Sequence, residues 1–391
     1  MKDLYDAPVA RRPGPHDTPE RTAFRDAIRR FVQAELAPHA ADWDEAGEVP
    51  WDVHARLGAL GVWGFGIDEA LGGLGFDDCH MRVAYCEEVA MCGATGVQAA
   101  LNGRQISVEP IARLASSDLA RRVLPEVLSG REGSSLAITE PSGGSDVAAL
   151  RTTARRDGNH WVLNGRKTFI TGGLRSSWFV VGARTGGAGL AGISLFLVPA
   201  DAPGFSRASV GPKQGWWASD TATLTFDDCR VPAENLMGDE DRGFLAIMEN
   251  FNLERLGLAC SCLGMMRVCL ADAVDWAGQR ETFGRPLIAR QAIRHKIADM
   301  SARIDALEAW IDRLAWEVNE GPMPVAGIAK CKVFASKSLE FCASEAMQVL
   351  GGAGYLRGGR VERIWREVKV FAIGGGSEEI MRDLAVRQMG L

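Results

Sequence analysis

Residues 138–146 read Ile138-Thr139-Glu140-Pro141-Ser142-Gly143-Gly144-Ser145-Asp146 and follow a short apolar lead-in at residues 135–137. A proline and two adjacent glycines predict that this stretch is a loop rather than a continued helix or strand. The hydroxyl groups of Thr139, Ser142 and Ser145 stand beside a backbone without Cβ atoms, so its N–H groups can approach a phosphate or the edge of a flat ring. A turn that binds no ligand is the simpler alternative for such a short pattern.

The composition is that of an ordinary soluble protein, with 47% hydrophobic and 24% charged residues in a chain of 391. The net charge of −6 argues against a nucleic-acid or anionic-membrane partner, because there is no basic surplus to neutralise phosphates. We find neither a signal-peptide pattern nor an uncharged stretch of membrane-helix length, and therefore expect a cytoplasmic protein that does not insert into membranes. The nine cysteines and six histidines do not cluster in the sequence, so we expect neither disulfides nor a metal site.

The periodicity of apolar residues changes twice along the chain. The N-terminal region, residues 1–134, shows helical spacing from residue 20 on, whereas residues 135–240 show short strands, two of which flank a turn at residues 157–159. Residues 241–391 are helical again, and the three- and four-residue steps within 293–318 are typical of a helix in an antiparallel bundle. The sequence therefore predicts three domains with these boundaries and an α+β fold.

Three motifs resemble those of one enzyme family. The loop at 138–146 resembles the flavin-binding signature Thr-Glu-Pro-x-x-Gly-Ser-Asp of the acyl-CoA dehydrogenases. Residues 164–171 resemble a family element in which an aromatic residue, usually Trp, packs on the flavin; here Phe169 takes that place, with Thr171 two residues later. Residues 348–355 resemble a second family signature, and no Gly-x-Gly-x-x-Gly motif of a Rossmann dehydrogenase is found. The resemblance implies an N-terminal α-helical domain, a middle β-barrel or sandwich domain and a C-terminal four-helix bundle.

The resemblance also implies FAD as the cofactor and a homotetramer built as a dimer of dimers. In the family, the loop corresponding to residues 279–286 reaches the diphosphate and adenine side of the flavin from a neighbouring subunit, and Arg280 is a suitable partner for the diphosphate. A capped connection between two helices, with Arg280 simply solvated, is the alternative. The residues implied to bind FAD are Leu136, Ile138, Thr139, Gly144, Ser145, Phe169, Thr171, Arg280, Thr282, Phe283, Gln291, Gln348, Gly351, Gly352, Ser377 and Glu379.

The position of the candidate catalytic base differs from that in the commonest family pattern. Many members carry it as the Glu of a Tyr-Glu-Gly-Thr string, but Gly375 stands at that position here. The string Asn252-Leu253-Glu254-Arg255 resembles the long-chain and isovaleryl-CoA members, whose base lies on this helix before an Arg. Glu254 shares a helix face with apolar residues, so burial should raise its pKa towards neutrality. The alternative is a solvated Glu254 paired with a neighbouring Arg.

The segment 94–104 resembles the part of the family that lines the closed end of the acyl pocket, although a plain packed helix explains most of its residues. Because Arg104 lies in this segment, an acyl chain that ends in a polar group or a carboxylate is an alternative. Asn252 stands where many relatives have an Asp that bonds the pantetheine, and Gly375 can offer its backbone N–H to the thioester oxygen. The residues expected to bind substrate are Gly375, Arg255, Asn252, Gln98, Asn102 and Ser145.

The predicted function is FAD-dependent α,β-dehydrogenation of an acyl-CoA, with electrons passed to an electron-transfer flavoprotein. The resemblance in base placement favours medium-to-long or branched acyl chains, and fatty-acid or branched-acyl metabolism as the setting. Desaturation of an acyl group on an acyl-carrier protein and an oxygen-using flavin oxidase are alternatives on the same scaffold. A non-catalytic binding relative is disfavoured by the acidic charge balance.

Overall fold

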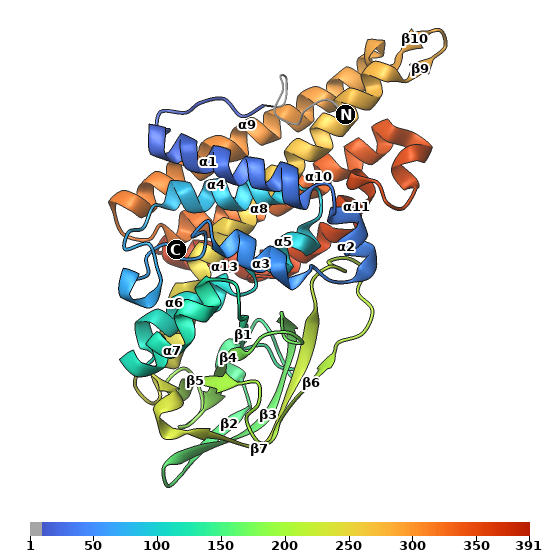
Figure 1. Cartoon of the computed structure of the whole chain (residues 1–391). Coiled ribbons are helices and arrows are strands. Elements are labelled where there is room, and N and C mark those ends of the chain that lie inside the picture. Colours follow the sequence, from blue (N-terminus) through green and yellow to red (C-terminus); the bar gives the residue numbers. More distant parts are fainter. Residues whose placement is uncertain (1–9) are drawn as a thin grey trace. The chain divides into compact units, whose positions relative to one another are not determined.

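The computed structural model describes residues 10–391 (Figure 1). These residues form two compact units whose segments alternate along the chain. We call the first the helical unit; it comprises residues 10–44, 78–96 and 252–391. We call the second the sheet unit; it comprises residues 45–77 and 97–251.

The helical unit is a bundle of long antiparallel helices. Helix α9 packs against α4 and α10, and α10 also packs against α11 and α13. The predicted apolar stripe is confirmed in α9, where Met300, Ile304 and Leu307 are buried one or two turns apart. The helices of this unit are α1 (Pro19–Phe31), a π-helical turn (Val32–Leu36), α4 (Cys79–Ala90), α9 (Gln291–Glu320), α10 (Val325–Leu350), α11 (Arg360–Glu367), α12 (Lys369–Ile373) and α13 (Glu378–Gln388).

Three helices contain residues of both units, namely α2 (Ala40–Ala46), α5 (Thr95–Asn102) and α8 (Gly243–Gln279). Helix α8 is long and apolar enough in composition to cross a membrane, which the sequence analysis did not anticipate. Within its most apolar window, however, 72% of the residues are buried inside the protein, as in the core helix of a bundle. The glycine and small residues of α8 allow this close packing; a methyl group on Gly264 would lie 2.3 Å from the Glu87 carbonyl oxygen.

The sheet unit contains one eight-stranded sheet with the order β6-β7-β3-β2-β4-β5-β8, and β1 pairs with β4 in parallel. The predicted turn at residues 157–159 is confirmed, because Asp157 pairs with His160 across it. The strands are β1 (Ser134–Ala137), β2 (Thr153–Asp157), β3 (His160–Thr171), β4 (Trp178–Arg184), β5 (Ile193–Pro199), β6 (Phe205–Ser209), β7 (Thr221–Pro232) and β8 (Leu236–Met237). The helices of this unit are α3 (Trp51–Gly58), α6 (Gln105–Leu114) and α7 (Ser117–Leu128).

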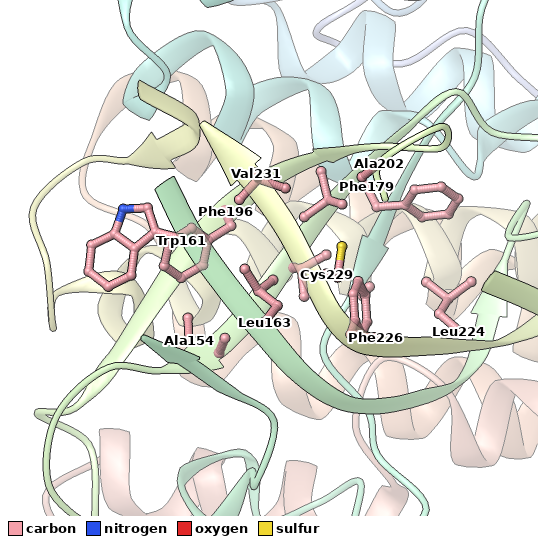
Figure 2. Packing of buried hydrophobic residues seen from close by; sticks show 14 of the residues in the cluster. Ala154, Trp161, Leu163, Phe179, Phe196, Ala202, Leu224, Phe226, Cys229 and Val231 are labelled. Carbon is pink, nitrogen blue, oxygen red and sulfur yellow. The ribbon is translucent and has the colours of Figure 1, made fainter. Parts of the chain in front are cut away.

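The core of the sheet unit is rich in aromatic side chains (Figure 2). The rings of Trp161 and Phe196 meet edge to face with centroids 5.2 Å apart, and Phe205 lies between Phe179 and Phe226 at 5.0 and 5.4 Å. Such buried ring pairs contribute both apolar area and a preferred orientation. This packing gives the loops at the edge of the sheet a rigid support.

The sequence pattern predicts two separate strands at residues 160–164 and 167–171, whereas the structure has one strand, β3, with two irregularities. The register against β7 shifts between Leu163 and Gly165 and again between Lys167 and Ile170. Each shift is a β-bulge, which interrupts the alternation of inward and outward side chains that predicts a strand. The second bulge contains Phe169, whose φ of 58° lies in the left-handed region.

Candidate active site

The loop at residues 138–146 leaves β1 and turns back on itself, with a bridge between Glu140 and Gly143. The Thr168 N–H donates to the Thr139 carbonyl oxygen at 2.9 Å, which holds the start of the loop against β3. Residues 141–146 are exposed, and a methyl group on Gly143 would meet no atom within 4 Å. The loop therefore has a fixed base and an open outer side, as a binding loop requires.

A buried ion pair forms the base of this loop, and sequence reasoning assigned it no role. Lys167 is fully buried on β3, and its Nζ donates to Glu140 Oε1 at 2.8 Å and to the Ile138 carbonyl oxygen at 3.0 Å. The Glu140 carboxylate also accepts from the backbone N–H groups of Arg151 and Thr152, at 2.6 and 2.8 Å. A Glu inside a loop motif and a Lys two residues before the flavin-stacking position were the available signals.

The pKa values of this pair follow from its setting. Burial alone would raise the pKa of Glu140, but the Lys167 charge and the backbone donors lower it to about 2. Burial lowers the pKa of Lys167 to about 8, against the opposing effect of Glu140. Both groups are therefore charged at neutral pH, and removing one would leave the other uncompensated.

Phe169 and Thr171 lie near the end of β3, close in sequence to this ion pair. Phe169 is 68% exposed and adopts a left-handed backbone conformation, which is unfavourable for a residue of its size. Exposed strain of this kind is typical of ligand sites, and a flat ring could cover the phenyl face. Thr171 pairs with Thr221, and its carbonyl oxygen accepts from Ser135 Oγ at 2.8 Å. The sheet unit thus offers an exposed aromatic ring and an open Gly-Ser loop, and both fit a flavin. In β1 and the loop, Leu136 is half-buried, Ile138 is buried, and Gly144 and Ser145 are exposed.

In the helical unit, the predicted flavin contact at residues 279–286 is a short hairpin between α8 and α9 (Figure 1). Its strands are β9 (Glu281–Thr282) and β10 (Arg285–Pro286). Phe283 at its tip is 97% exposed with a φ of 52°, and the Arg290 guanidinium lies 5.6 Å from its ring centroid. Arg280 and Gln291 are also exposed at the two ends of the hairpin. An aromatic side chain this exposed indicates a surface that is covered in an assembly.

The remaining predicted flavin residues lie at the ends of α10 and α13. Gln348, Gly351 and Gly352 are exposed at the end of α10, and Gly351 has a φ of 59° that favours glycine. Ser377 caps α13 by accepting from the Ile380 N–H, and Glu379 is exposed in the first turn of that helix. These groups present backbone and polar atoms to the outside.

Glu254 lies on α8 with an enclosed carboxylate. Its Oε2 atom is buried and has no hydrogen-bond partner among the described residues. Burial raises the pKa of Glu254 to about 7, although the charges of Arg255 and Lys332 oppose this rise. The expected rise in pKa is therefore found, and its cause is desolvation. A carboxylate with a pKa near neutrality is suited to take up a proton at physiological pH.

The glycine turn, residues 374–376, faces this part of α8. Gly375 and Gly376 have φ values of 66° and 98°, which favour glycine. A methyl group on Gly375 would lie only 2.6 Å from Leu258 Cδ1, and Leu258 stands one helical turn after Glu254. A side chain at position 375 would therefore require the Leu258 side chain to move and would be strained by the positive φ. The Gly375 carbonyl oxygen accepts from Arg255 Nε at 3.0 Å.

Two expected substrate residues, Asn252 and Arg255, are joined by a hydrogen bond from Arg255 Nη1 to Asn252 Oδ1 at 3.1 Å. Both side chains are buried. In the sheet unit, Gln98 is buried and Asn102 is half-buried on α5. These four residues carry the polar groups that the sequence analysis expected to meet the substrate.

Arg104 is held inside the sheet unit. Its guanidinium donates to the carbonyl oxygens of Val127 and Glu132 at 3.2 and 3.1 Å and bonds His54 Nδ1 at 2.5 Å. It also lies 4.3 Å from the centroid of the Trp63 ring. Arg104 is 3% exposed. Its hydrogen bonds connect α7 and α3 to the start of α6. This arrangement disfavours the option that Arg104 recognises a polar chain end.

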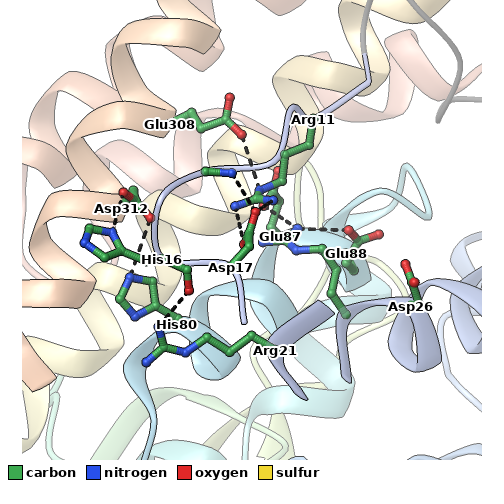
Figure 3. Close-up of polar contacts among 12 residues, drawn as sticks. Arg11, His16, Asp17, Arg21, Asp26, His80, Glu87, Glu88, Glu308 and Asp312 are labelled. Atoms are coloured by element: carbon green, nitrogen blue, oxygen red, sulfur yellow. Dashed lines mark hydrogen bonds and ion pairs between the residues drawn. The ribbon is translucent and has the colours of Figure 1, made fainter. Parts of the chain in front are cut away.

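The histidines are scattered in the sequence, but the fold brings His16 and His80 together. Their rings lie 5.1 Å apart, and His16 Nδ1 bonds Asp312 Oδ2 at 2.8 Å (Figure 3). The three side chains could by spacing hold a metal ion. However, Asn319 Oδ1 accepts from the Cys79 N–H, so its amide nitrogen donates to His80 Nδ1 and the His80 proton resides on Nε2. In this tautomer the Nε2–H faces Asp312, and we interpret the cluster as a hydrogen-bonded network.

Comparison with known proteins identifies the family. Three family models match the chain in order: the acyl-CoA dehydrogenase N-terminal domain over residues 18–131, the middle domain over 135–229 and the C-terminal domain over 241–390. The chain therefore belongs to the acyl-CoA dehydrogenase family and is an FAD-dependent oxidoreductase. The α+β fold predicted from the sequence is confirmed.

Individual relatives agree over nearly the full length. The mitochondrial isovaleryl-CoA dehydrogenase of Oryza sativa subsp. japonica is 33% identical, covering 95% of this chain and 91% of its own. The crystal structure of acyl-CoA dehydrogenase from Geobacillus kaustophilus superposes with a TM-score of 0.91 at 32% identity, covering 97% of this chain and 100% of its own. A glutaryl-CoA dehydrogenase from Mycobacterium smegmatis in complex with FADH2 is 27% identical with a TM-score of 0.88, and 95% of each chain is covered.

Proposed function

We propose that this protein oxidises a saturated acyl-CoA thioester to the 2-enoyl-CoA and that Glu254 is the base. The observation that carries the proposal is the enclosed Glu254 carboxylate, whose Oε2 lacks a hydrogen-bond partner among the described residues and whose pKa is raised to about 7. A structural ion pair would hold its carboxylate by direct hydrogen bonds, as Glu140 is held by Lys167. Glu254 is thus available to accept a proton from a substrate.

The reaction removes a proton from the α-carbon and a hydride from the β-carbon, and a double bond forms between them. Glu254 takes the α-proton and ends the step as the neutral acid. FAD, when bound, would accept the hydride and its two electrons. The α-proton is weakly acidic, so charge that develops on the thioester oxygen must be stabilised by placed donors. We assign that role to the Gly375 N–H, for which no acceptor occurs among residues 10–391.

The glycine turn offers no side chain that could act as a second base at position 375. Leu258 occupies the space that a side chain there would need, and the positive φ of Gly375 disfavours any other residue. Glu254 and Leu258 lie on the same face of α8, one turn apart. Glu254 on α8 and the glycine turn, which has no side chain, therefore belong to the same proposed site.

For the substrate, we infer an acyl-CoA with a medium-to-long or branched apolar chain. The similar proteins include long-chain specific and isovaleryl-CoA dehydrogenases, each 33% identical. The internal bonding of Arg104 supports an apolar rather than carboxylate-bearing chain end. Asn252, Arg255, Gln98, Asn102 and Ser145 are the polar residues that we assign to substrate binding.

The assembly that we propose is a homotetramer, with Arg280 and Phe283 reaching the flavin of a neighbouring subunit. The 97% exposure of Phe283 supports this, because an isolated chain gains nothing from a fully hydrated aromatic ring. For the electron acceptor we propose an electron-transfer flavoprotein. One similar structure, at 32% identity, is described as an electron transferring flavoprotein of Acidaminococcus fermentans. A cytoplasmic location is part of the same proposal.

Anaerobic titration of the purified protein with a panel of acyl-CoAs tests the function. We expect a yellow protein with about one FAD per chain, whose flavin band bleaches with the preferred substrate. Absence of bleaching with every CoA thioester, but bleaching with an acyl-carrier-protein substrate, would replace the proposed substrate class. Comparable turnover on butyryl-CoA and poor turnover on longer and branched chains would contradict the chain-length inference.

A further inference from the structure

Lys332 is a buried cation in the helical unit, on the face of α10 that packs into the bundle. The side chain is 1% exposed, and its neighbours on the buried face of α10 include Ala329 and Ala335. An ammonium group in such surroundings loses its hydration, so it is retained only where other groups compensate its charge. The groups around Lys332 therefore indicate which carbonyl dipoles and carboxylates its ammonium charge stabilises.

The Lys332 ammonium faces the glycine turn. Nζ donates to the Gly376 carbonyl oxygen at 2.7 Å, and the adjacent Gly375 carbonyl oxygen accepts from Arg255 Nε at 3.0 Å. Two cations, from α10 and α8, thus hold two consecutive carbonyl groups. The turn has no side chains of its own to lock it, so these hydrogen bonds fix its conformation.

The Lys332 charge interacts electrostatically with two carboxylates. It also interacts with Arg255 and with the Cys262 thiol of α8. The first is Glu378 of α13, which already accepts from Ser336 Oγ at 2.8 Å and pairs with Lys337 at 3.2 Å and Arg382 at 3.4 Å.

The second carboxylate is Glu254, whose buried Oε2 has no hydrogen-bond partner within residues 10–391. The cations that act on it are Arg255 and Lys332. Arg255 donates to two neutral oxygens, those of Gly375 and Asn252. Glu378 is therefore already compensated by other groups, whereas Arg255 and Lys332 are the cations that act on Glu254.

We propose that Lys332 is a positioning residue of the active site, which fixes the glycine turn that carries the Gly375 N–H and favours the ionised form of Glu254. The inference rests on the proposed function, in which Glu254 is the base. Burial alone would keep the Glu254 carboxyl protonated well above neutrality. The cations of Arg255 and Lys332 lower its pKa and so keep a useful fraction of the base ionised.

The test compares Lys332→Met and Lys332→Gln with the parent protein, each loaded with FAD. Gln can still donate to the Gly376 carbonyl but carries no charge, so the pair of variants separates the charge from the hydrogen bond. Lys330→Met is the matched control, because Lys330 lies on the same helix and is exposed. The measurement is the rate of anaerobic flavin reduction by saturating acyl-CoA between pH 5.5 and 9.5, together with FAD content and thermal midpoint.

Both Lys332 variants should retain FAD and shift the acid limb of the rate profile to higher pH. A shift of about one pH unit corresponds to a rate about tenfold lower below the midpoint, and the deficit should shrink at high pH. Lys330→Met should follow the parent. A parental profile in both variants, or a rate that Lys332→Gln lowers by the same factor at every pH, would overturn the inference. Failure of both variants to fold would do so as well, because it would assign Lys332 to stability alone.

The variant Glu254→Gln separates this inference from the proposed function. If Glu254→Gln reduces its flavin at the parental rate, the base assignment itself is wrong. If Glu254→Gln is inactive while the Lys332 variants keep the parental profile, the base assignment stands and only the inference about Lys332 fails.

Discussion

Changing Glu254 to Gln should alter the stability of the protein in a pH-dependent way. The pKa of Glu254 is raised from its ordinary 4.5 to about 7 by burial, so the folded state holds a proton that the unfolded state releases. Below the unfolded value, both states are protonated and the group has no effect. Between about pH 4.5 and 7 the unfolded state releases the proton while the folded state retains it, so stability falls with rising pH and levels off above 7. Gln never ionises and avoids this loss.

The magnitude follows from the size of the shift. Each pH unit corresponds to about 1.4 kcal/mol, which sets an upper limit of about 3.4 kcal/mol at pH 8. The residue as a whole is half-buried although its Oε2 atom is enclosed, so we expect about 1–2 kcal/mol of this limit for Glu254→Gln. At pH 4.5 and below, the two proteins should be equally stable. The assay is unfolding of the FAD-loaded proteins at pH 4.5 and 8, at matched protein concentration and FAD excess.

The matched control is Glu249→Gln, also on α8 but with a side chain that is 60% exposed. Its effect should stay within about 0.5 kcal/mol at both pH values. An equal stability difference for Glu254→Gln at both pH values, or a loss of stability at pH 8, would refute the reasoning. Either result would mean that the carboxylate is hydrated or that it makes a favourable ion pair.

Two further predictions concern the flavin-binding elements. Lys167→Met leaves the buried Glu140 carboxylate without its cation and should destabilise the protein by about 3–5 kcal/mol with loss of FAD, measured by unfolding and flavin content; a yellow protein of parental stability would contradict the role of the pair. Arg280→Glu puts a carboxylate where a diphosphate partner is proposed and should weaken FAD retention and assembly, measured by equilibrium dialysis and sedimentation; unchanged values would mean that Arg280 is only solvated.

Motifs and periodicity were sufficient to predict the fold class, the apolar stripe of α9 and the turn between β2 and β3. Each depends on local chemistry, namely glycine in a turn or apolar residues at a fixed spacing. The bulges of β3 could not be predicted in this way. Phe169 takes a left-handed conformation because of the sheet around it, and nothing in its own sequence requires that.

The side-chain contacts of the site were predictable only in part. The raised pKa of Glu254 followed from its place on an apolar helix face. The clash between Leu258 and any side chain at Gly375, the Lys167–Glu140 pair and the burial of Lys332 depend on residues far apart in the chain. His16 and His80 show the same limit, because a search of the sequence for clustered histidines cannot detect a pair brought together by folding.

The most direct test of the assignment of Glu254 as the base is single-turnover reduction of the bound flavin by the preferred acyl-CoA, followed anaerobically in the parent and in Glu254→Gln. The variant should bind FAD normally, while the rate of bleaching falls by about 10²–10⁴, the usual effect of losing a general base. Bleaching at the parental rate would contradict the account. In that case the proton acceptor would have to be another carboxylate, with Glu378 and Glu379 the first to examine.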